Sequence, residues 1–357
     1  MEMISKNGDK MPEKQIIPKE YKSTLSLRET ESAIKKIKDF FQSELSAALK
    51  LQRVSAPRFV AKDTGINDDL NGVEKKVSFE VKYDPSLKAE VVFSLAKWKR
   101  MALKDYEFKE GEGLYTDMDA IRPDEEILDN LHSVYVDQWD WEKIIFKEER
   151  TLDYLKDTVK KIYSVMKKTE DIVQKEYPEI VPFLPKEITF LHTEDLVKKY
   201  PEKSSKEREY LAAKEYGAIF LIGIGGMLEN GKIHDGRAPD YDDWSTETFD
   251  GKKGLNGDII VWHPILMREF EISSMGIRVD KKALIKQLKI RDCEDRLELQ
   301  WHKMLMKDEL PLTIGGGIGQ SRLCMFFLRK AHIGEVQASI WPEAIIKHCK
   351  NNGIILL

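Results

Sequence analysis

A glycine-rich segment near the C-terminus carries the strongest chemical signal in the chain. It reads Leu312-Thr-Ile-Gly-Gly-Gly-Ile-Gly-Gln-Ser-Arg322, and an apolar stretch from Leu323 to Leu328 follows it. We expect a strand that enters a glycine-dense turn, with Arg322 opening a helix. Glycines let a ligand approach the main chain closely, and an arginine offers a planar fork for phosphate oxygens. The pattern predicts a nucleotide site, and the alternative is a tight turn beside a surface arginine.

This segment matches neither of the two common phosphate-binding loops. A P-loop requires Lys and then Ser or Thr after its last glycine, whereas Gly319 is followed by Gln, Ser and Arg. A dinucleotide-binding fingerprint requires a following βαβ unit, which is not predicted here. Other residues must therefore identify the nucleotide chemistry.

Two acidic residues in neighbouring strand-like runs are candidate metal ligands. A hairpin centred near Pro264 would place Asp258 and Glu271 directly opposite one another, with Cβ atoms about 5 Å apart. Unpaired like charges at that distance are unfavourable, so the arrangement predicts a hard cation such as Mg2+ between them, together with a substrate phosphate. A shift of one residue in register would leave two separate solvated acids instead.

A third candidate segment, Ser133-Val-Tyr-Val-Asp-Gln-Trp-Asp-Trp-Glu142, predicts a strand. Alternation places Val134, Val136, Gln138 and Asp140 on one face, which changes from apolar to polar along the strand. We expect Gln138 and Asp140 to line a pocket floor, where Asp140 would hold a ligand ammonium group. The alternative is a strand that emerges into solvent.

Short strands and a few long helices must position these residues. Ser26 and Glu29 have capping-box spacing before a helical apolar stripe that ends at Leu49, and an amphipathic helix is predicted from Thr151 to Glu176. Asn-Gly pairs at 230–231 and 256–257 favour antiparallel hairpins. Strands are predicted at 77–82, 89–95, 131–141, 218–224, 258–262 and 269–274. We expect an α+β fold, with a mixed, largely antiparallel sheet flanked by helices.

The composition indicates a globular protein and excludes several classes. The 357 residues are 41% hydrophobic, enough for a large core, and 58 basic against 62 acidic residues give a net charge of -4, which does not favour binding to nucleic-acid backbones. The three cysteines form no CxxC pair, and neither a membrane span nor a signal peptide is predicted. We expect a cytoplasmic protein with a flexible extension over residues 1–19 and a single catalytic domain over 20–357.

Six ordered motifs carry a resemblance to a known enzyme family. They are Ser94-Leu-Ala-Lys-Trp-Lys-Arg100, Gly111-Glu-Gly-Leu-Tyr115, His132-Ser-Val-Tyr-Val-Asp-Gln-Trp-Asp-Trp141, Ala238-Pro-Asp-Tyr-Asp-Asp-Trp244, Phe270-Glu-Ile-Ser-Ser-Met-Gly-Ile-Arg278 and the run from Gly315 to Arg322. The chain resembles the ammonia-dependent asparagine synthetases, or aspartate-ammonia ligases, from about Tyr21 to Trp341. That family is similar to the catalytic domain of class II aminoacyl-tRNA synthetases, especially the aspartyl enzyme, so the resemblance implies that fold and a homodimer.

The resemblance implies a reaction in two steps. Aspartate and ATP, with Mg2+, would form β-aspartyl-AMP and pyrophosphate, and ammonia would then displace AMP to give asparagine. In this family pattern Arg122 corresponds to the arginine that holds the α-phosphate, while Asp258 and Glu271 match the metal-binding acids. The nucleotide would lie against Asp242, Gly315, Gly316, Gly317 and Arg322.

The same resemblance assigns the amino-acid site. Lys99 and Arg278 would surround a substrate carboxylate, and Asp140 would bind the ammonium group. Gln138 and Ser274 would lie nearby.

The nitrogen donor is predicted to be free ammonia. Asp68 matches an aspartate expected near the incoming nitrogen, where a carboxylate would hold ammonium and then accept its proton. The bacterial pattern before this aspartate is Gly-Asp-Gly-Thr-Gln, whereas this chain has Asp63-Thr-Gly-Ile-Asn67. A glutamine-dependent synthetase with an N-terminal nucleophile would need a cysteine after Met1, but position 2 is Glu and the first cysteine is Cys293.

Two alternatives on the same scaffold remain open. One is an enzyme that binds or charges transfer RNA, which usually needs an anticodon-reading domain larger than the segment before Tyr21. The other is a non-catalytic paralogue that binds an adenylate, against which the retained Asp258, Glu271 and Arg122 argue. We therefore expect aspartate, ATP and ammonia as partners, with no nucleic acid and no membrane.

Overall fold

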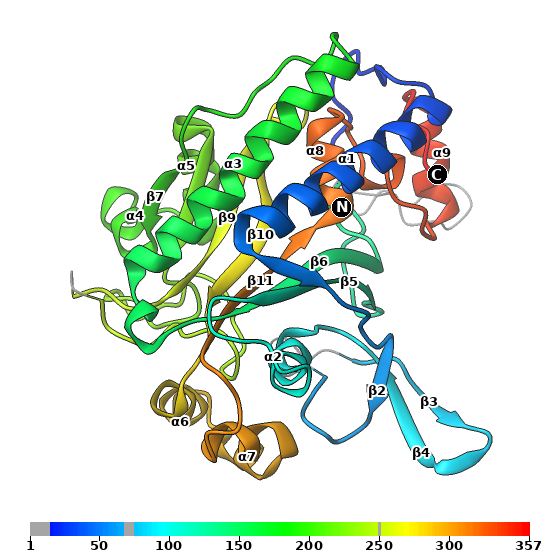
Figure 1. Cartoon of the computed structure of the whole chain (residues 1–357). Helices are drawn as coiled ribbons and strands as arrows, with labels where there is room; N and C mark the ends of the chain where they lie inside the picture. Colours follow the sequence, from blue (N-terminus) through cyan, green and yellow to red (C-terminus); the bar gives the residue numbers. More distant parts are fainter. Residues whose placement is uncertain (1–14, 68–74, 249–250) are drawn as a thin grey trace.

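An eight-stranded sheet forms the centre of the fold (Figure 1). The computed structural model describes residues 15–67, 75–248 and 251–357. In sheet order the strands are β1 (Leu51–Arg53), β5 (Gly113–Ile121), β6 (Tyr135–Ile144), β11 (Thr313–Gly319), β10 (Arg268–Ile277), β9 (Asn256–His263), β8 (Ala218–Ile222) and β7 (Thr189–His192). Neighbours from β5 to β8 run antiparallel, and the two edge pairs are parallel. The predicted mixed, largely antiparallel sheet is confirmed.

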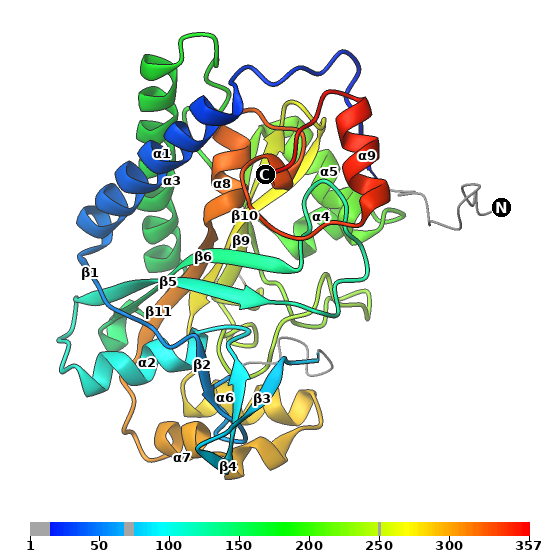
Figure 2. The same ribbon diagram turned by 90° about the vertical axis from the view of Figure 1, so that its right-hand side faces the viewer.

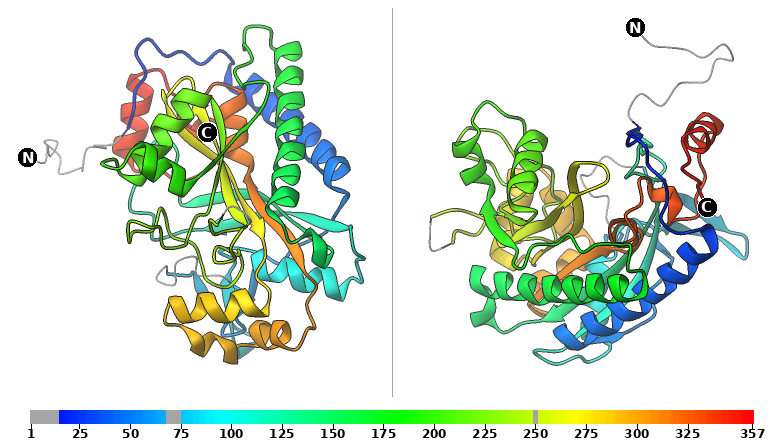
Figure 3. Two further views of the ribbon diagram at one scale, coloured as in Figure 1. Left: turned by 90° about the vertical axis from the view of Figure 1, so that its left-hand side faces the viewer. Right: turned by 90° about the horizontal axis from the view of Figure 1, so that it is seen from above.

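Three helices cover one face of this sheet. α1 (Leu27–Leu49) and α3 (Leu152–Glu176) lie side by side, and α8 (Gln320–Phe327) packs beside α1 (Figures 1 and 3). The predicted capping box is present at Ser26, and the Thr151 hydroxyl accepts the backbone N–H of Tyr154 in the first turn of α3. Both caps satisfy donors that a helix start leaves unpaired.

Strand β6 separates the core from the opposite face of the sheet. Trp139 and Trp141 are fully buried under the helices, and the Trp139 ring stacks on Phe41 with 4.8 Å between the centroids. Because successive side chains of a strand alternate, Gln138 and Asp140 point to the other face, as predicted. That face carries the cleft described below.

Two helices flank the cleft on this second face. α2 (Ala96–Asp105) contacts β5, β6 and β11, whereas α5 (Ser205–Tyr216) contacts β8, β9 and β10. Lys99 of α2 and Lys206 of α5 both line the cleft. A smaller apolar cluster that includes Ile260 holds α5 on the sheet.

The remaining elements lie around this framework. The three-stranded sheet of β2 (Phe59–Ala61), β3 (Ser78–Val81) and β4 (Asp84–Val91) lies with α6 (Lys281–Ile290) and α7 (Gln300–Met306) at one end of the molecule (Figures 1 and 2). The other elements are α4 (Thr193–Lys199), α9 (Glu343–Asn351) and the 3-10 turns η1 (Lys147–Glu149), η2 (Glu294–Glu298) and η3 (Ile333–Glu335). Among the described residues, no helix is both long and apolar enough to span a bilayer.

Two turn predictions are wrong and one is confirmed. Gly315, Gly316 and Gly317 lie within β11, hydrogen-bonded between β6 and β10, rather than in a turn. The Asn-Gly pair at 256–257 lies inside β9, because both residues find partners on β10. At 230–231, by contrast, the chain does turn, and the Gly231 N–H donates to the carbonyl of Leu228.

The described end of the N-terminal segment is attached to the rest of the protein. The Ile16 N–H donates to the Asn130 side chain at 2.7 Å, and the Asn130 amide donates back to the Ile16 carbonyl at 2.9 Å. Gln15 lies 3.2 Å from His332. The boundary at residue 19 stays a prediction, since residues 1–14 lie outside the described part of the chain.

Candidate active site

A cleft of about 540 Å³ brings together almost all the residues that the sequence singles out. It opens on the sheet face opposite α1 and α3. Asp68 lies outside the described residues, and Gly315 lies in β11 without lining the cleft. The predicted residues that do line it are Lys99, Arg122, Gln138, Asp140, Asp242, Asp258, Glu271, Ser274, Arg278, Gly316, Gly317 and Arg322.

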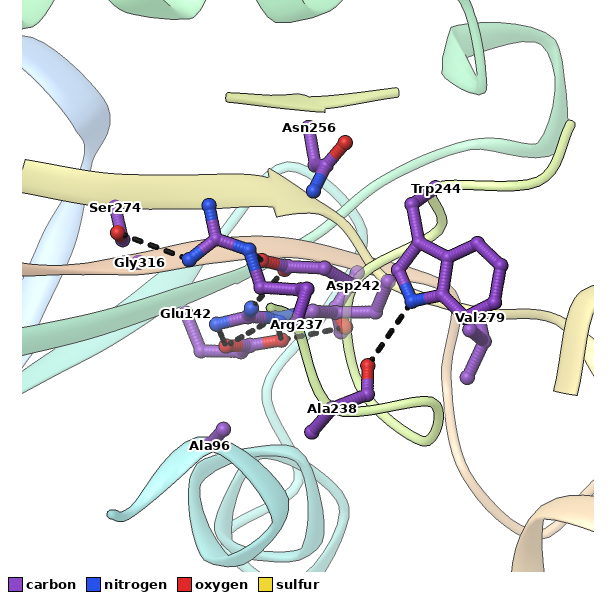
Figure 4. Close-up of polar contacts among 12 residues, drawn as sticks. Ala96, Glu142, Arg237, Ala238, Asp242, Trp244, Asn256, Ser274, Val279 and Gly316 are labelled. Atoms are coloured by element: carbon purple, nitrogen blue, oxygen red, sulfur yellow. Dashed lines mark hydrogen bonds and ion pairs between the residues drawn. The ribbon is translucent and has the colours of Figure 1, made fainter. Parts of the chain in front are cut away.

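A buried ion network forms the inner end of the cleft (Figure 4). Arg278 donates through Nε and Nη2 to the two oxygens of Glu142, at 3.0 and 2.9 Å, and its Nη1 pairs with Asp242. Glu142 also accepts a 2.7 Å hydrogen bond from the Thr313 hydroxyl. Burial alone would lower the pKa of Arg278, but the two carboxylates outweigh it and raise the pKa above its ordinary value.

Lys99 and Asp140 form a second buried pair beside this network. Lys99 Nζ lies 3.2 Å from the Asp140 carboxylate and donates to the carbonyls of Trp141 and Gly316, each at 3.1 Å. Burial lowers the pKa of Lys99 although Asp140 and Glu142 oppose the shift. Without a substrate, the two residues expected to bind opposite charges of the amino acid neutralise each other.

The two acids of the β9–β10 hairpin converge by a different route from the one predicted. Asp258 is paired with Ser274 and Glu271 with Ile260, so the expectation of direct opposition is wrong. A bulge between Glu271 and Ser273 adds one residue to β10 and shifts the register. The acids still meet, because the Ser274 hydroxyl lies 2.7 Å from Asp258 Oδ1 and 3.2 Å from Glu271 Oε1.

Arg237 neutralises part of this acidic pair. Its Nη2 lies 2.5 Å from Asp258 Oδ1. Its Nη1 donates to the Ser274 hydroxyl at 3.0 Å (Figure 4). Burial raises the pKa of Asp258 to about 6, and the negative charge of Glu271 adds to the shift against the effect of Arg237. The site therefore holds more negative charge than one arginine balances.

Two further arginines border the acids. Arg122 follows the end of β5, its guanidinium lies 5.6 Å from the Phe93 ring centroid, and its buried Nε has no hydrogen-bond partner among the described residues. Arg322, at the start of α8, donates through Nη1 to the Glu271 carbonyl at 3.1 Å. Burial and the nearby charge of Arg322 both lower the pKa of Arg122. Two cations that repel each other in a cleft favour an anionic ligand between them.

The glycines of β11 make room for the polar side chains of β6. A Cβ on Gly317 would stand 2.5 Å from Gln138 Oε1, and a Cβ on Gly315 would stand 1.9 Å from Glu142 Oε2. A side chain at Gly315 would displace the Glu142 carboxylate, and one at Gly317 would displace the Gln138 amide. Glycine at these positions therefore lets the polar side chains of β6 lie directly over the strand.

Comparison with known proteins identifies the family. The family model of aspartate-ammonia ligase (AsnA) matches residues 28–353. The chain belongs to the aspartate-ammonia ligase family. It is 59% identical over 345 residues to the aspartate-ammonia ligase of Clostridium perfringens, covering 97% of this chain and 100% of that protein. It is 58% identical over 342 residues to the Parabacteroides distasonis protein of the same name, with 96% and 99% covered.

Solved structures show the fold. The asparaginyl-tRNA synthetase of Pyrococcus horikoshii, complexed with asparaginyl-adenylate, superposes with a TM-score of 0.64 at 15% identity and covers 88% of this chain and 70% of its own. For the aspartyl-tRNA synthetase of Entamoeba histolytica the TM-score is 0.55 at 13% identity, with 87% and 57% covered. The predicted class II synthetase-like fold of this aspartate-ammonia ligase is confirmed.

Sequence reasoning assigned no role to two residues of this ligase site: Arg237, which lines the cleft, and Glu142, which lies buried behind it and pairs with Arg278. Glu142 continues the alternation of Gln138 and Asp140, so the same strand pattern could have predicted it on the cleft face. Arg237 precedes the acidic loop that begins at Ala238, and no local pattern distinguishes it from a solvated charge. Its role becomes visible only when the fold brings it to the β9–β10 hairpin.

The oxygen ligands at the hairpin suit Mg2+. In the described part of the chain, no three or more His, Cys, Asp or Glu side chains gather as a metal cage. Mg2+ does not require one, since it keeps several waters and binds one or two carboxylates together with substrate phosphates. The chemistry of Asp258 and Glu271, bridged through Ser274, therefore fits this ion.

Proposed function

We propose that this ligase forms L-asparagine from L-aspartate and ammonia by way of β-aspartyl-AMP, with AMP and pyrophosphate as the other products. One observation carries the proposal. A single cleft holds a buried set of paired charges suited to an amino acid, and beside it two acids and two arginines suited to a magnesium-bound triphosphate. The family membership of the chain supports the same reaction.

The buried charges are suited to the two ends of the aspartate backbone. We assign Lys99 and Arg278 to the α-carboxylate and Asp140 to the α-ammonium group, with Gln138 and Ser274 beside them. Binding would exchange the present ion pairs for pairs with the substrate. The buried charges would then stay compensated, which avoids the large penalty of an isolated charge.

The arginines and acids are suited to the first chemical step. Attack of the β-carboxylate on the α-phosphate brings two anions together, so charge must be neutralised as the P–O bond forms. We assign Arg122 to the α-phosphate and Arg322 to the neighbouring phosphate oxygens. Asp258 and Glu271 would hold Mg2+, which supplies Lewis-acid stabilisation of phosphate charge when bound. Asp242, Gly316 and Gly317 complete the nucleotide surface that we propose. Gly315, which was predicted with them, does not line the cleft and is connected to its amino-acid end through Glu142.

In the second step ammonia attacks the β-carbonyl and AMP leaves. Ammonium must lose a proton before it attacks, and we assign that proton to Asp68, on the basis of the family pattern alone. We further propose a homodimer, as the family resemblance implies, and a cytoplasmic location, where Cys293, Cys324 and Cys349 would stay reduced, as they are free here.

A direct product assay tests the proposed function. The protein is incubated with Mg2+, ATP, aspartate and ammonium, and AMP, pyrophosphate and asparagine are measured. We expect the three in equal amounts without transfer RNA. ADP in place of AMP would refute the adenylate route, and glutamine supporting the same rate as equimolar ammonium would refute the choice of nitrogen donor. Size-exclusion chromatography with light scattering tests the dimer.

A further inference from the structure

Lys206 is a charged cleft residue to which the assignments above give no role. It lies in the first turn of α5, and its Nζ is 3.0 Å from Glu209 Oε2 and 3.2 Å from Asp235 Oδ2. The side chain is 61% exposed and lines the cleft together with Asp235 and Arg237. The two carboxylates thus hold the Lys206 ammonium group where it can contact an anionic ligand in the cleft.

A buried pair holds Lys206 from behind. Only 6% of the Glu209 side chain is exposed, and its Oε1 lies 2.9 Å from Nε2 of His234, which is fully buried. Glu209 therefore cannot follow Lys206 into solvent, and the salt bridge fixes the ammonium near the cleft. An ordinary surface lysine pairs with exposed partners and gains little from them.

Lys206 shares the cleft with two arginines of the phosphate region. Lys206, Arg237 and Arg322 all line the cleft that Glu271 lines, and Arg322 donates to the Glu271 carbonyl at 3.1 Å. Arg322 lies in α8, Lys206 lies in α5, and Arg237 lies in the loop between β8 and β9. Three separate segments therefore bring a cation to the region where a triphosphate would lie.

The order of the cations across the sheet gives Lys206 a specific place. Arg122 follows β5, Arg322 follows β11, and Lys206 lies on α5, which packs on β9 and β10. With the α-phosphate at Arg122, the rest of the triphosphate extends past Arg322 toward α5. The β- and γ-phosphates leave together as pyrophosphate, so Lys206 would meet the leaving group.

We infer that Lys206 binds the pyrophosphate portion of ATP, and that Glu209, supported by His234, is a positioning residue for its ammonium group. The inference rests on the proposed adenylate-forming function. When the triphosphate binds, the ammonium exchanges Asp235 for phosphate oxygens and keeps Glu209. After P–O cleavage it stabilises the charge on the departing pyrophosphate, and it makes no contact with AMP.

Product inhibition tests this inference, because pyrophosphate and AMP each contain a different part of ATP and so report on different parts of the site. In Lys206→Met we expect the inhibition constant for pyrophosphate and the KM for ATP to rise about tenfold, the scale of one lost hydrogen bond between charged groups. The inhibition constant for AMP and the KM for aspartate should stay within about twofold of wild type, well below that scale. If turnover is too slow, binding of pyrophosphate with Mg2+ is measured by calorimetry, with the same expectation.

Three variants separate binding from folding. Lys203→Met removes another lysine near the start of α5, whose partner Glu207 is half-exposed and outside the cleft, and should leave every constant unchanged. Lys206→Arg keeps the charge and should restore most of the pyrophosphate affinity. Glu209→Gln keeps Lys206 but removes the charge that holds its ammonium group. This variant should raise the inhibition constant for pyrophosphate and leave the inhibition constant for AMP unchanged.

The outcomes distinguish the inference from the proposed function. Wild-type protein that makes no asparagine from aspartate, ATP and ammonium would overturn the proposed function. An active wild type together with an unchanged pyrophosphate constant in Lys206→Met would overturn the Lys206 assignment alone. An equal loss of affinity for pyrophosphate and for AMP in Lys206→Met would also overturn it, since such a result indicates a general distortion of the cleft.

Discussion

Gly315 lies directly opposite Glu142 in the β6–β11 ladder, and the Glu142 carboxylate occupies the space that a Cβ on Gly315 would need. The same carboxylate holds Arg278 through two hydrogen bonds. The glycine run of β11 is therefore connected to the amino-acid end of the cleft through the position of Glu142. These glycines leave space for the side chains of β6, in addition to the nucleotide contact that the sequence predicts.

Gly315→Ala should damage aspartate binding more than ATP binding. The added methyl group would force Glu142 out of its place and leave Arg278 without its bidentate partner. Breaking such a buried pair costs several kcal/mol, so we expect the KM for aspartate to rise about 100-fold or more. Steady-state kinetics and the thermal midpoint of both proteins check this. Folded Gly315→Ala protein with the wild-type KM for aspartate would contradict the connection through Glu142.

Arg122→Ala should lose adenylate formation. Arg122 is the cation next to Arg322, and its buried Nε finds no partner in the part of the chain that the structure describes. We expect its removal to lower the rate by about 100-fold, the scale of a lost transition-state charge partner. Arg122→Lys keeps the charge without the planar fork and should recover only part of the rate. The measurement is aspartate-dependent exchange of labelled pyrophosphate into ATP. Exchange in Arg122→Ala near the wild-type rate would reject the assignment.

Local sequence patterns predict most elements of this fold. The helix predicted over Thr151–Glu176 differs from α3 only at the residue that caps it, and the capping box at Ser26 is present. Alternation along 133–142 predicts Gln138 and Asp140 on one face at a pocket floor, and both line the cleft. These signals are local, because helix caps and strand alternation depend on residues close together in the chain.

Register and long-range pairing could not be predicted in the same way. The hairpin turns between His263 and Arg268, so Glu271 falls opposite Ile260, and the bulge that follows puts Ser274 opposite Asp258. The two acids therefore meet at the Ser274 hydroxyl and not face to face. The glycines at 315–317 form a strand because β6 and β10 lie on either side of them. Arg237 meets its partners only through the fold. In each case the deciding neighbour is distant in sequence, so local propensity does not report it.

Removing either hairpin acid should raise the requirement for Mg2+. With Asp258→Asn or Glu271→Gln we expect the Mg2+ concentration for half-maximal AMP formation to rise about tenfold or more, since even groups outside the ligand shell change metal affinity by that much. Glu269→Gln is the matched control, because Glu269 lies on the same strand, pairs with Arg268 and does not line the cleft. A Mg2+ titration at saturating ATP makes the comparison. Unchanged Mg2+ dependence in both acid variants would exclude the hairpin as the metal site.

His263 should make the protein less stable as the pH falls below about 6.5. It is fully buried at the end of β9, and its Nδ1 accepts the Leu266 N–H at 3.2 Å, which requires the neutral ring. Burial lowers its pKa to about 3, whereas an unfolded histidine titrates near 6.5. Between these values only the unfolded chain takes up the proton, so stability falls from about pH 6.5 down to about pH 3.

The size of this effect can be measured against a matched variant. From pH 7.5 to 5.0 the protonation of His263 in the unfolded chain should cost about 2 kcal/mol. His263→Asn removes the titrating group and offers an oxygen that can accept the Leu266 N–H, so its stability should fall less over this interval. His348→Asn, in α9, serves as the control. Denaturant midpoints at the two pH values make the test, and an equal fall in wild type and His263→Asn would show that the acid sensitivity arises elsewhere.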